Sequence, residues 1–533
     1  MTFSTIDAEN LAQALTDGGE IAFLDVREEG EHGQSHPILA VNLPLGRLEI
    51  MVRDLLPGAA SRIVIADDNG AADGEADRAA ERLGAMGYGN VTVLEDGFAA
   101  WGAAGLELYS GVNVLSKTFG EWVELEFATP SLSADEVKAK LDAGADLVIL
   151  DSRPWGEYRN MSIPSGINVP GGELVLRVAD LAPDPETLVV VNCAGRTRSI
   201  LGTQSLVNAG LVNPVAALRN GTMGWQLAGH ELEFAAGRRY GEVSGPALAW
   251  SRAAAARVAE RFAVASVDAA TIEAWRTDRD RTLYLLDVRS PEEYLAGHLA
   301  GSRPAPGGQL VQATDHYLAT RNARVVLLDD DGVRARLTAS WLKQLGWADS
   351  FVLQDGLPDG LESGPHVPDV ALPGGVEPVL ISAGELAGRI AENGLTVIDV
   401  GSSQAYAKGH VPGAWWLSRA RLGTSFERLP PTDTYVVSAG EPALAALAAH
   451  EIAALGGVPA MVLEGGSTAW HQAGLALEEG ATRLTSEPVD VYYRPYEQGG
   501  GAAEAMQGYL DWELALPGKL ARDKTLSFPR VAG

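Results

Sequence analysis

The sequence is poor in cysteine, in long apolar runs and in positive charge. Its 533 residues include one cysteine, Cys193, which excludes an intrachain disulfide and a zinc site built from several cysteines. No apolar run approaches the roughly 18–20 residues that a membrane-spanning helix needs. The first ten residues lack the basic patch and apolar stretch of a secretory signal, so we expect a cytoplasmic protein without a membrane partner.

Acidic residues outnumber basic ones. The 41 Lys and Arg against 70 Asp and Glu give a formal net charge of -29, which argues against binding to nucleic acid or to an anionic lipid surface. An anionic substrate would therefore need local positive charge at its site. The nine histidines are scattered without metal-ligand spacing, so we expect neither a metal nor another cofactor.

The chain repeats one pattern four times. Each repeat begins with an apolar run that ends in an aspartate. A second apolar run and a helical stretch follow, and then a third apolar run that leads into a glycine turn. Short apolar strands that alternate with helices are typical of parallel sheets. We therefore predict an α/β fold of four tandem domains, each a mainly parallel sheet with helices on both faces. The aspartates that mark the repeats are Asp25, Asp151, Asp287 and Asp399.

The repeats divide the chain into units of ordinary domain size. We place the four domains at residues 1–112, 113–240, 241–370 and 371–482, followed by a C-terminal tail over 483–533. The tail does not repeat, but it contains several tyrosines and a tryptophan, which disordered tails usually lack. We expect it to pack back on a domain or across the interface of a homodimer.

The residues most typical of a reactive site follow the second apolar run of the second repeat. That run should end at Asn192, and Cys193 is the first residue of the turn before the next helix, which we expect to begin near Ser199. Ligands of open α/β sheets bind at this end of the strands. Backbone N–H groups of the turn, the positive end of the helix and two arginines should favour the thiolate. The loop after the cysteine reads Ala194, Gly195, Arg196, Thr197, Arg198, Ser199.

A cysteine, four residues and an arginine between a strand and a helix resemble the active loop of the rhodanese family. The motif Asp151-Ser152-Arg153 followed by Gly156-Glu157-Tyr158 is also similar to that family, and the resemblance covers about residues 5–476. It implies a sulfurtransferase in which a small anionic donor such as thiosulfate gives sulfur to Cys193. The persulfide would then pass its sulfur to a thiol or cyanide.

The resemblance also implies roles for the loop. Backbone amides of residues 194–198 would hold the sulfur, and Arg196 and Arg198 would attract the anionic donor. Arg153 would contact the substrate or support the site from behind, and Ser199 would cap the helix.

Loop length separates this resemblance from related chemistry. In phosphatases and arsenate reductases of similar fold, five residues separate the cysteine from the arginine of the active loop, which gives room for a tetrahedral oxyanion. Only four residues separate Cys193 from Arg198, which favours sulfur over phosphate. A phosphatase-like hydrolase is therefore the less favoured alternative.

The other three repeats lack a sulfur atom at the equivalent position. Alignment from the second apolar run places Asp67, Asp329 and Ala439 opposite Cys193, and none of these can carry a persulfide. We predict that the first, third and fourth domains are inactive in sulfur transfer, although Arg334 stands opposite Arg198. Such domains suit a second hypothesis, in which the protein is a persulfide carrier or docking scaffold that delivers sulfur to an acceptor protein.

Overall fold

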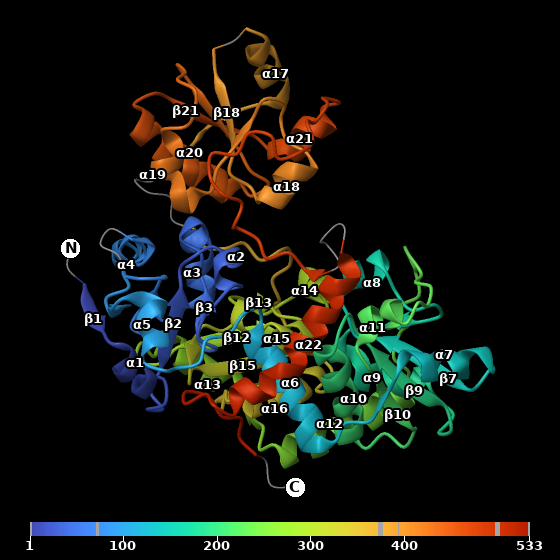
Figure 1. The fold of residues 1–533 in the computed structure, drawn as a ribbon. Helices are drawn as coiled ribbons and strands as arrows, with labels where there is room; N and C mark the ends of the chain where they lie inside the picture. Colours follow the sequence, from blue (N-terminus) through green and yellow to red (C-terminus); the bar gives the residue numbers. More distant parts are fainter. Residues whose placement is uncertain (1–2, 71–73, 371–376, 393, 496–500, 531–533) are drawn as a thin grey trace.

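Four sheets, one for each repeat, form the centres of four α/β domains (Figure 1). The computed structural model describes residues 3–70, 74–370, 377–392, 394–495 and 501–530. In each sheet the strands of the repeat lie in the order first, fifth, fourth, second, third, and all their pairings are parallel. Helices pack on both faces of the sheets, and the predicted α/β fold is therefore confirmed.

The central strands explain this architecture. Val189, Val190 and Val191 are all 0% exposed although successive side chains of a strand point to opposite faces. Both faces of the sheet must therefore be covered, as in parallel α/β sheets generally. The apolar run that marks each repeat becomes such a central strand because it buries apolar area on both sides.

The first two domains contain the following elements. The first has strands β1 (Ser4–Ile6), β2 (Ile21–Asp25), β3 (Val41–Asn42), β4 (Arg62–Ala66) and β5 (Val91–Leu94), with helices α1 (Ala8–Ala14), α2 (Glu29–His32), α3 (Leu48–Leu55), α4 (Glu75–Ala85) and α5 (Gly97–Ala103). The second has strands β6 (Ser131–Leu132), β7 (Leu147–Asp151), β8 (Ile167–Asn168), β9 (Leu188–Asn192) and β10 (Val215–Leu218), with helices α7 (Ala134–Asp142), α8 (Trp155–Asn160), α9 (Leu174–Leu181), α10 (Thr197–Ala209) and α11 (Gly221–Leu227).

The last two domains repeat the plan. The third has strands β11 (Ala265–Val267), β12 (Leu283–Asp287), β13 (Arg303–Pro304), β15 (Arg324–Leu328) and β16 (Ser350–Leu353), with helices α13 (Ala269–Thr277), α14 (Pro291–Ala296), α15 (Gly307–Gln312) and α16 (Arg334–Gln344). The fourth has strands β17 (Val379–Ile381), β18 (Thr396–Asp399), β19 (Trp415–Trp416), β20 (Tyr435–Ser438) and β21 (Ala460–Leu463), with helices α17 (Ala383–Ala391), α18 (Ser403–Lys408), α19 (Leu422–Phe426), α20 (Pro442–Gly456) and α21 (Gly466–Gln472).

Three further helices surround the second domain. They are α6 (Val114–Phe127) before it, α12 (Gly245–Arg261) after it, and α22 (Ala502–Leu520) from the tail. The tail helix packs on α6 and α11, so the red α22 lies beside the cyan α6 in Figure 1. The predicted packing of the tail on a domain is thus confirmed, and α10 becomes buried on almost all sides.

The domains associate in two pairs. In the second and third domains the backbones of Gly171 and Gly308 meet so closely that a Cβ added at Gly308 would lie 3.0 Å from the Gly171 nitrogen. In the first and fourth, Arg419 donates to the Gly46 carbonyl at 2.9 Å and to the carboxylate of Glu49. The pairs are joined where β14 (Thr320–Arg321) of the third domain extends the first sheet as an antiparallel edge strand.

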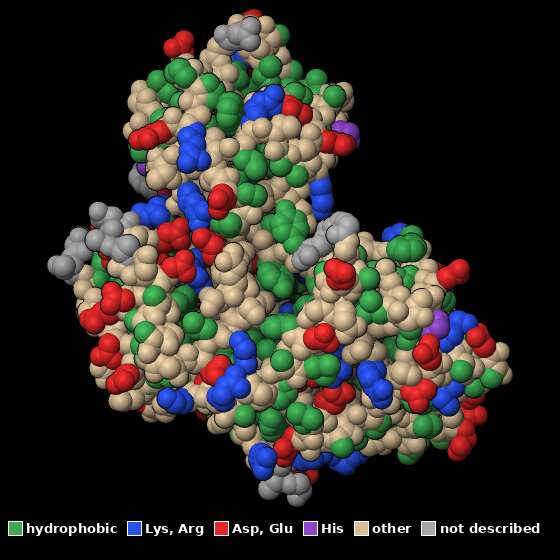
Figure 2. Space-filling model, in the orientation of Figure 1, with side chains coloured by type: hydrophobic (Ala, Val, Ile, Leu, Met, Phe, Trp, Pro, Cys, Tyr) green, Lys and Arg blue, Asp and Glu red, His purple; other side chains and the backbone are tan. Residues whose placement is uncertain are grey.

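The surface carries charges of both signs. Acidic and basic side chains are mixed over the face in Figure 2, and the fourth domain stands above a narrower waist. Within the described ranges, no helix combines the length and apolar character needed to span a bilayer.

Candidate active site

The predicted loop lies between β9 and α10 and is fixed by α11. The Cys193 carbonyl accepts hydrogen bonds from the backbone nitrogen of Thr222 at 2.8 Å and from its hydroxyl at 3.0 Å. Gly221 adopts a φ of +55°, and a Cβ there would lie 2.4 Å from the Cys193 carbonyl oxygen. Only glycine therefore fits at this position. The equivalent approach in the fourth domain brings Gly466 against Ala439.

The start of α10 differs from the prediction. The helix begins at Thr197 rather than near Ser199, and Arg196 is its N-cap residue, without a side-chain capping bond. The predicted capping role of Ser199 is therefore wrong. Its hydroxyl instead donates to the Arg196 carbonyl at 2.8 Å and accepts from the Cys193 thiol at 3.5 Å. Ser199 contacts the sulfur because the helix starts two residues earlier.

Arg198 lies beside the sulfur and is paired with an acid. It donates to both oxygens of Glu157, at 2.9 and 2.8 Å, and to the side-chain oxygen of Gln309 from the third domain at 3.2 Å. Burial alone would raise the pKa of Glu157, but Arg198 lowers that pKa to about 2. The arginine stays charged, and its positive charge acts electrostatically on the Cys193 thiol.

The other two predicted arginines are also paired with carboxylates. Arg196 is bound by Glu121 of α6 at 2.7 and 2.8 Å and also by Glu124, so its charge is neutralised by carboxylates. Arg153 is 1% exposed and pairs with Asp151 at 2.9 and 2.7 Å, which places it behind the loop. Of the two roles implied for Arg153, the structure therefore favours support from behind the site.

The thiol does not have the lowered pKa expected from the sequence. Cys193 is 2% exposed, and burial raises its pKa above the ordinary value. Arg198 and the hydrogen bond to Ser199 lower the pKa in part, while Glu513 raises it. Desolvation outweighs the arginine and the loop because the sulfur lies under neighbouring side chains.

The tail helix supplies groups that sequence reasoning missed. Glu513 is 2% exposed, and its Oε1 accepts a hydrogen bond from the Tyr509 hydroxyl at 3.0 Å. Its Oε2 has no hydrogen-bond partner among the described residues and lies 3.2 Å from where a Cβ on Gly195 would be. Burial raises the pKa of Glu513, and nearby Lys117 opposes that rise. Nothing in the tail sequence placed these side chains over the cysteine loop.

Lys117 of α6 completes this cluster. It donates to the Val112 carbonyl at 2.6 Å, and its ammonium lies 5.1 and 5.0 Å from the ring centroids of Tyr509 and Trp512. Burial lowers its pKa, whereas Glu513 and Asp315 raise it. A buried acid and a buried base thus lie together above the cysteine loop.

The loop opens into a cavity of about 470 Å³. Its walls come from every domain and from the tail. They include Lys117 of α6, Glu29 of the first domain, Gln309 of the third, Gln404 of the fourth, and Tyr492, Arg494, Tyr509 and Glu513 of the tail. The loop residues that line it are Cys193, Ala194, Gly195, Arg196, Thr197 and Arg198, whereas Arg153 and Ser199 do not. The structure therefore brings most of the predicted site residues together in one cavity.

The first and third domains hold carboxylates at the equivalent strand ends, whereas the fourth has Ala439 there. Asp67 accepts from the Gly70 and Ala76 nitrogens at 2.7 and 3.1 Å, and Asp329 accepts from the Ala335 nitrogen at 2.9 Å. The backbone donors of these two loops therefore bind a carboxylate of the protein itself. Arg334 is bound by Glu173, Glu293 and Asp331, so it is not directed at a ligand either.

Comparison with known proteins agrees with this arrangement. A solved structure of a thiosulfate sulfurtransferase from Pseudomonas aeruginosa is 50% identical, with a TM-score of 0.94, and covers 99% of this chain and 100% of its own. YrkF of Bacillus subtilis, named as a sulfur carrier protein, is 29% identical over 96 residues, which are 17% of this chain and about half of that relative. The sequence model of the Rhodanese-like domain family matches residues 7–104, 133–228, 269–362 and 382–473. Since these matches cover most of the sequence, the chain belongs to the rhodanese family of sulfurtransferases.

Proposed function

We propose that the protein moves sulfane sulfur from thiosulfate or a persulfide donor to a thiol or cyanide through a persulfide on Cys193. The observation that carries this proposal is the position of the Cys193 sulfur, at the carboxyl end of β9 and beneath the start of α10, in a cavity large enough for a small anion. The whole-chain similarity to a thiosulfate sulfurtransferase supports the choice of donor.

In the first step, the thiolate attacks the outer sulfur of thiosulfate. A bond forms from Cys193 Sγ to that sulfur, the bond between the two donor sulfurs breaks, and sulfite leaves with its electron pair. The thiol proton must leave first, because the pKa of Cys193 is raised. Glu513 would accept it, because both groups line one cavity and the transfer neutralises the carboxylate whose charge disfavours the thiolate.

In the second step, the acceptor attacks the outer sulfur of the persulfide. The bond from Cys193 Sγ to that sulfur breaks, its electron pair stays on Cys193, and a thiol acceptor leaves its proton on the enzyme. Only the domain at residues 113–240 would carry sulfur. The domains at 1–112, 241–370 and 371–482 would shape the cavity, and the tail at 483–533 would cover it.

The mass of the intact protein after brief exposure to thiosulfate tests the proposal. We expect a gain of one sulfur atom that is absent in Cys193→Ala and is discharged by cyanide. An Asp142→Asn variant, at an exposed position of α7, should behave as the wild type. Failure to take sulfur from any donor would refute the proposal.

Persulfide delivery to an acceptor protein is the second candidate function. Two observations favour it: YrkF is named as a sulfur carrier, and Cys193 is buried beneath the tail. Loading from an organic persulfide but not from thiosulfate, with slow discharge by cyanide, would support this candidate over the first.

A further inference from the structure

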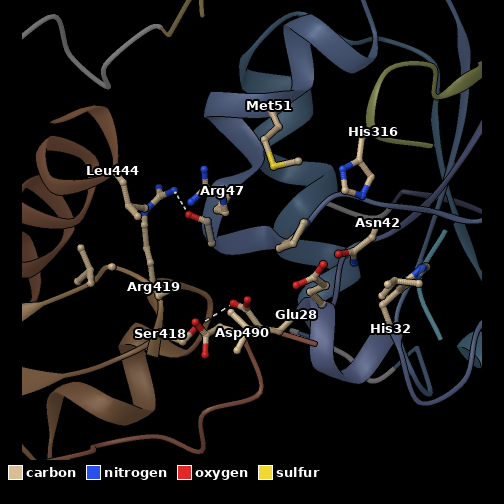
Figure 3. A pocket seen from close by; sticks show the side chains of 18 of the residues that line it. Glu28, His32, Asn42, Arg47, Met51, His316, Ser418, Arg419, Leu444 and Asp490 are labelled. Atoms are coloured by element: carbon tan, nitrogen blue, oxygen red, sulfur yellow. Dashed lines mark hydrogen bonds between the residues drawn. The ribbon is translucent and has the colours of Figure 1, made fainter. Parts of the chain in front are cut away.

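A second cavity lies between the first and fourth domains and adjoins the Cys193 cavity. It has a volume of about 370 Å³, and Figure 3 shows side chains from both domains around it. The two cavities share the lining residues Glu29, Val112, Asn113, His316 and Val491. A molecule in the second cavity would therefore lie next to the cavity of the reactive sulfur.

This cavity has a buried carboxylate that is only partly bonded. Glu28 is 5% exposed, and one of its oxygens accepts from the Ser418 hydroxyl at 2.8 Å across the domain interface. Within the described ranges, its other oxygen has no hydrogen bond and its charge has no ion-pair partner. The pKa of Glu28 is raised to about 7, chiefly by burial; the charges of Asp490 and Glu31 act in the same direction, and the Ser418 hydrogen bond and Arg421 oppose them. This acid needs a cation or a hydrogen-bond donor.

Asp490 adds a second acceptor to the same wall (Figure 3). One of its oxygens accepts from the Ser403 nitrogen at 2.8 Å, while the other is buried and has no hydrogen-bond partner among the described residues. Asp490 thus presents an unpartnered oxygen to the same cavity as Glu28, and its negative charge acts on Glu28. Such an arrangement strongly favours a positively charged ligand with several N–H donors.

The arginines at this cavity do not neutralise these acids. Arg47 is bound by Glu441 at 2.6 Å, and Arg419 is bound by Glu49 and Glu451 at 2.7 and 2.6 Å. Their charges are therefore met by carboxylates that do not line the cavity. The cavity is left with acidic groups, and its remaining walls include the apolar side chains of Met51, Trp416 and Leu444.

We infer that this cavity holds the ammonium end of a thiol acceptor while its sulfur reaches the persulfide in the adjoining cavity. An ammonium group offers three donors to the unpartnered oxygens, and Met51 and Trp416 would cover the methylene groups beside it. The inference rests on the proposed function and names the class of its acceptor, a primary aminothiol. The bonds made and broken are those of the second step above.

Acceptor kinetics of the full-length protein test this inference. With thiosulfate as donor, kcat/KM is measured for cysteamine, for neutral N-acetylcysteamine and for cyanide, in the wild type and in Glu28→Gln. We expect the variant to lower the ratio of cysteamine to N-acetylcysteamine by about tenfold or more, because a charge-assisted hydrogen bond is lost. Comparing ratios cancels the different reactivities of the two thiols. Glu260→Gln, at an exposed position of α12, is the matched control.

A second measurement needs no variant. The thiol-free cation n-propylammonium should inhibit the wild type competitively against cysteamine and leave turnover with cyanide unchanged. This measurement decides the matter if Glu28→Gln disturbs the domain interface. An unchanged cysteamine ratio in a folded variant, or equal inhibition with every acceptor, would overturn the inference. Absence of turnover with cyanide in the wild type would instead refute the proposed function.

Discussion

The ion pair between Arg198 and Glu157 should be a main source of local stability for the Cys193 loop. The two side chains are 11% and 21% exposed, and the arginine donates to both carboxylate oxygens. The pKa of Glu157, lowered from 4.5 to about 2, corresponds to about 3 kcal/mol of favourable interaction. Since this pKa is lowered on folding, the stabilisation is present above about pH 4.5 and is lost as the pH falls towards 2.

Removing one partner should cost more than removing both. Arg198→Met leaves the Glu157 carboxylate buried without its cation, and we expect a loss of about 3–5 kcal/mol. The double variant Arg198→Met/Glu157→Gln should recover most of this loss because it removes the uncompensated charge. Unfolding of a multi-domain chain is not two-state, so the assay is amide hydrogen exchange in peptides covering residues 150–160 and 193–209, which report opening of this region alone.

The reasoning fails if the single variant changes the free energy of opening by less than about 1 kcal/mol. It also fails if the double variant opens as readily as the single one, since the carboxylate would then not be the cause of the instability. Glu157→Gln alone serves as the control for the loss of the pair without a buried anion. Glu260→Gln controls for a change of one surface charge.

Three further predictions concern the Cys193 loop and its counterpart in the third domain. Glu513→Gln should lower the pKa of Cys193 and speed its alkylation by iodoacetamide several-fold at pH 7, and an unchanged rate would show that this charge does not reach the sulfur. Gly221→Ala should abolish sulfur loading, as judged by intact mass, because its Cβ would lie 2.4 Å from a backbone oxygen. Gly195→Ala should reduce loading less, because its Cβ would meet only the ends of side chains. Equal losses of loading in the two variants would contradict this reasoning. Asp329→Cys should still load one sulfur atom; a gain of two would make the third domain competent.

The parts of the fold set by local sequence could be predicted. The apolar residues 188–191 become a buried central strand because the run is short and rich in β-branched valine, which fits a strand covered on both faces. The same pattern places Cys193 at a strand end, and four repeats make the domain plan plain. These features depend on residues that are neighbours in the chain.

The parts of the site set by distant contacts could not be predicted. Glu513 lies over the Cys193 loop because α22 packs on α6 and α11, and no pattern in the tail records that contact. The raised pKa of Cys193 has the same origin, since burial by other parts of the chain outweighs the arginine in the loop. The start of α10 at Thr197 could not be predicted because its N-cap residue, Arg196, makes no side-chain capping bond and is not a residue type that marks helix starts.

The position of α22 has a consequence for how the protein is made. Residues 502–520 complete a site whose cysteine is synthesised more than three hundred residues earlier. Domains generally fold in order as they leave the ribosome. A nascent chain would therefore expose the Cys193 thiol to oxidants and electrophiles until α22 has been synthesised and has docked on α6 and α11.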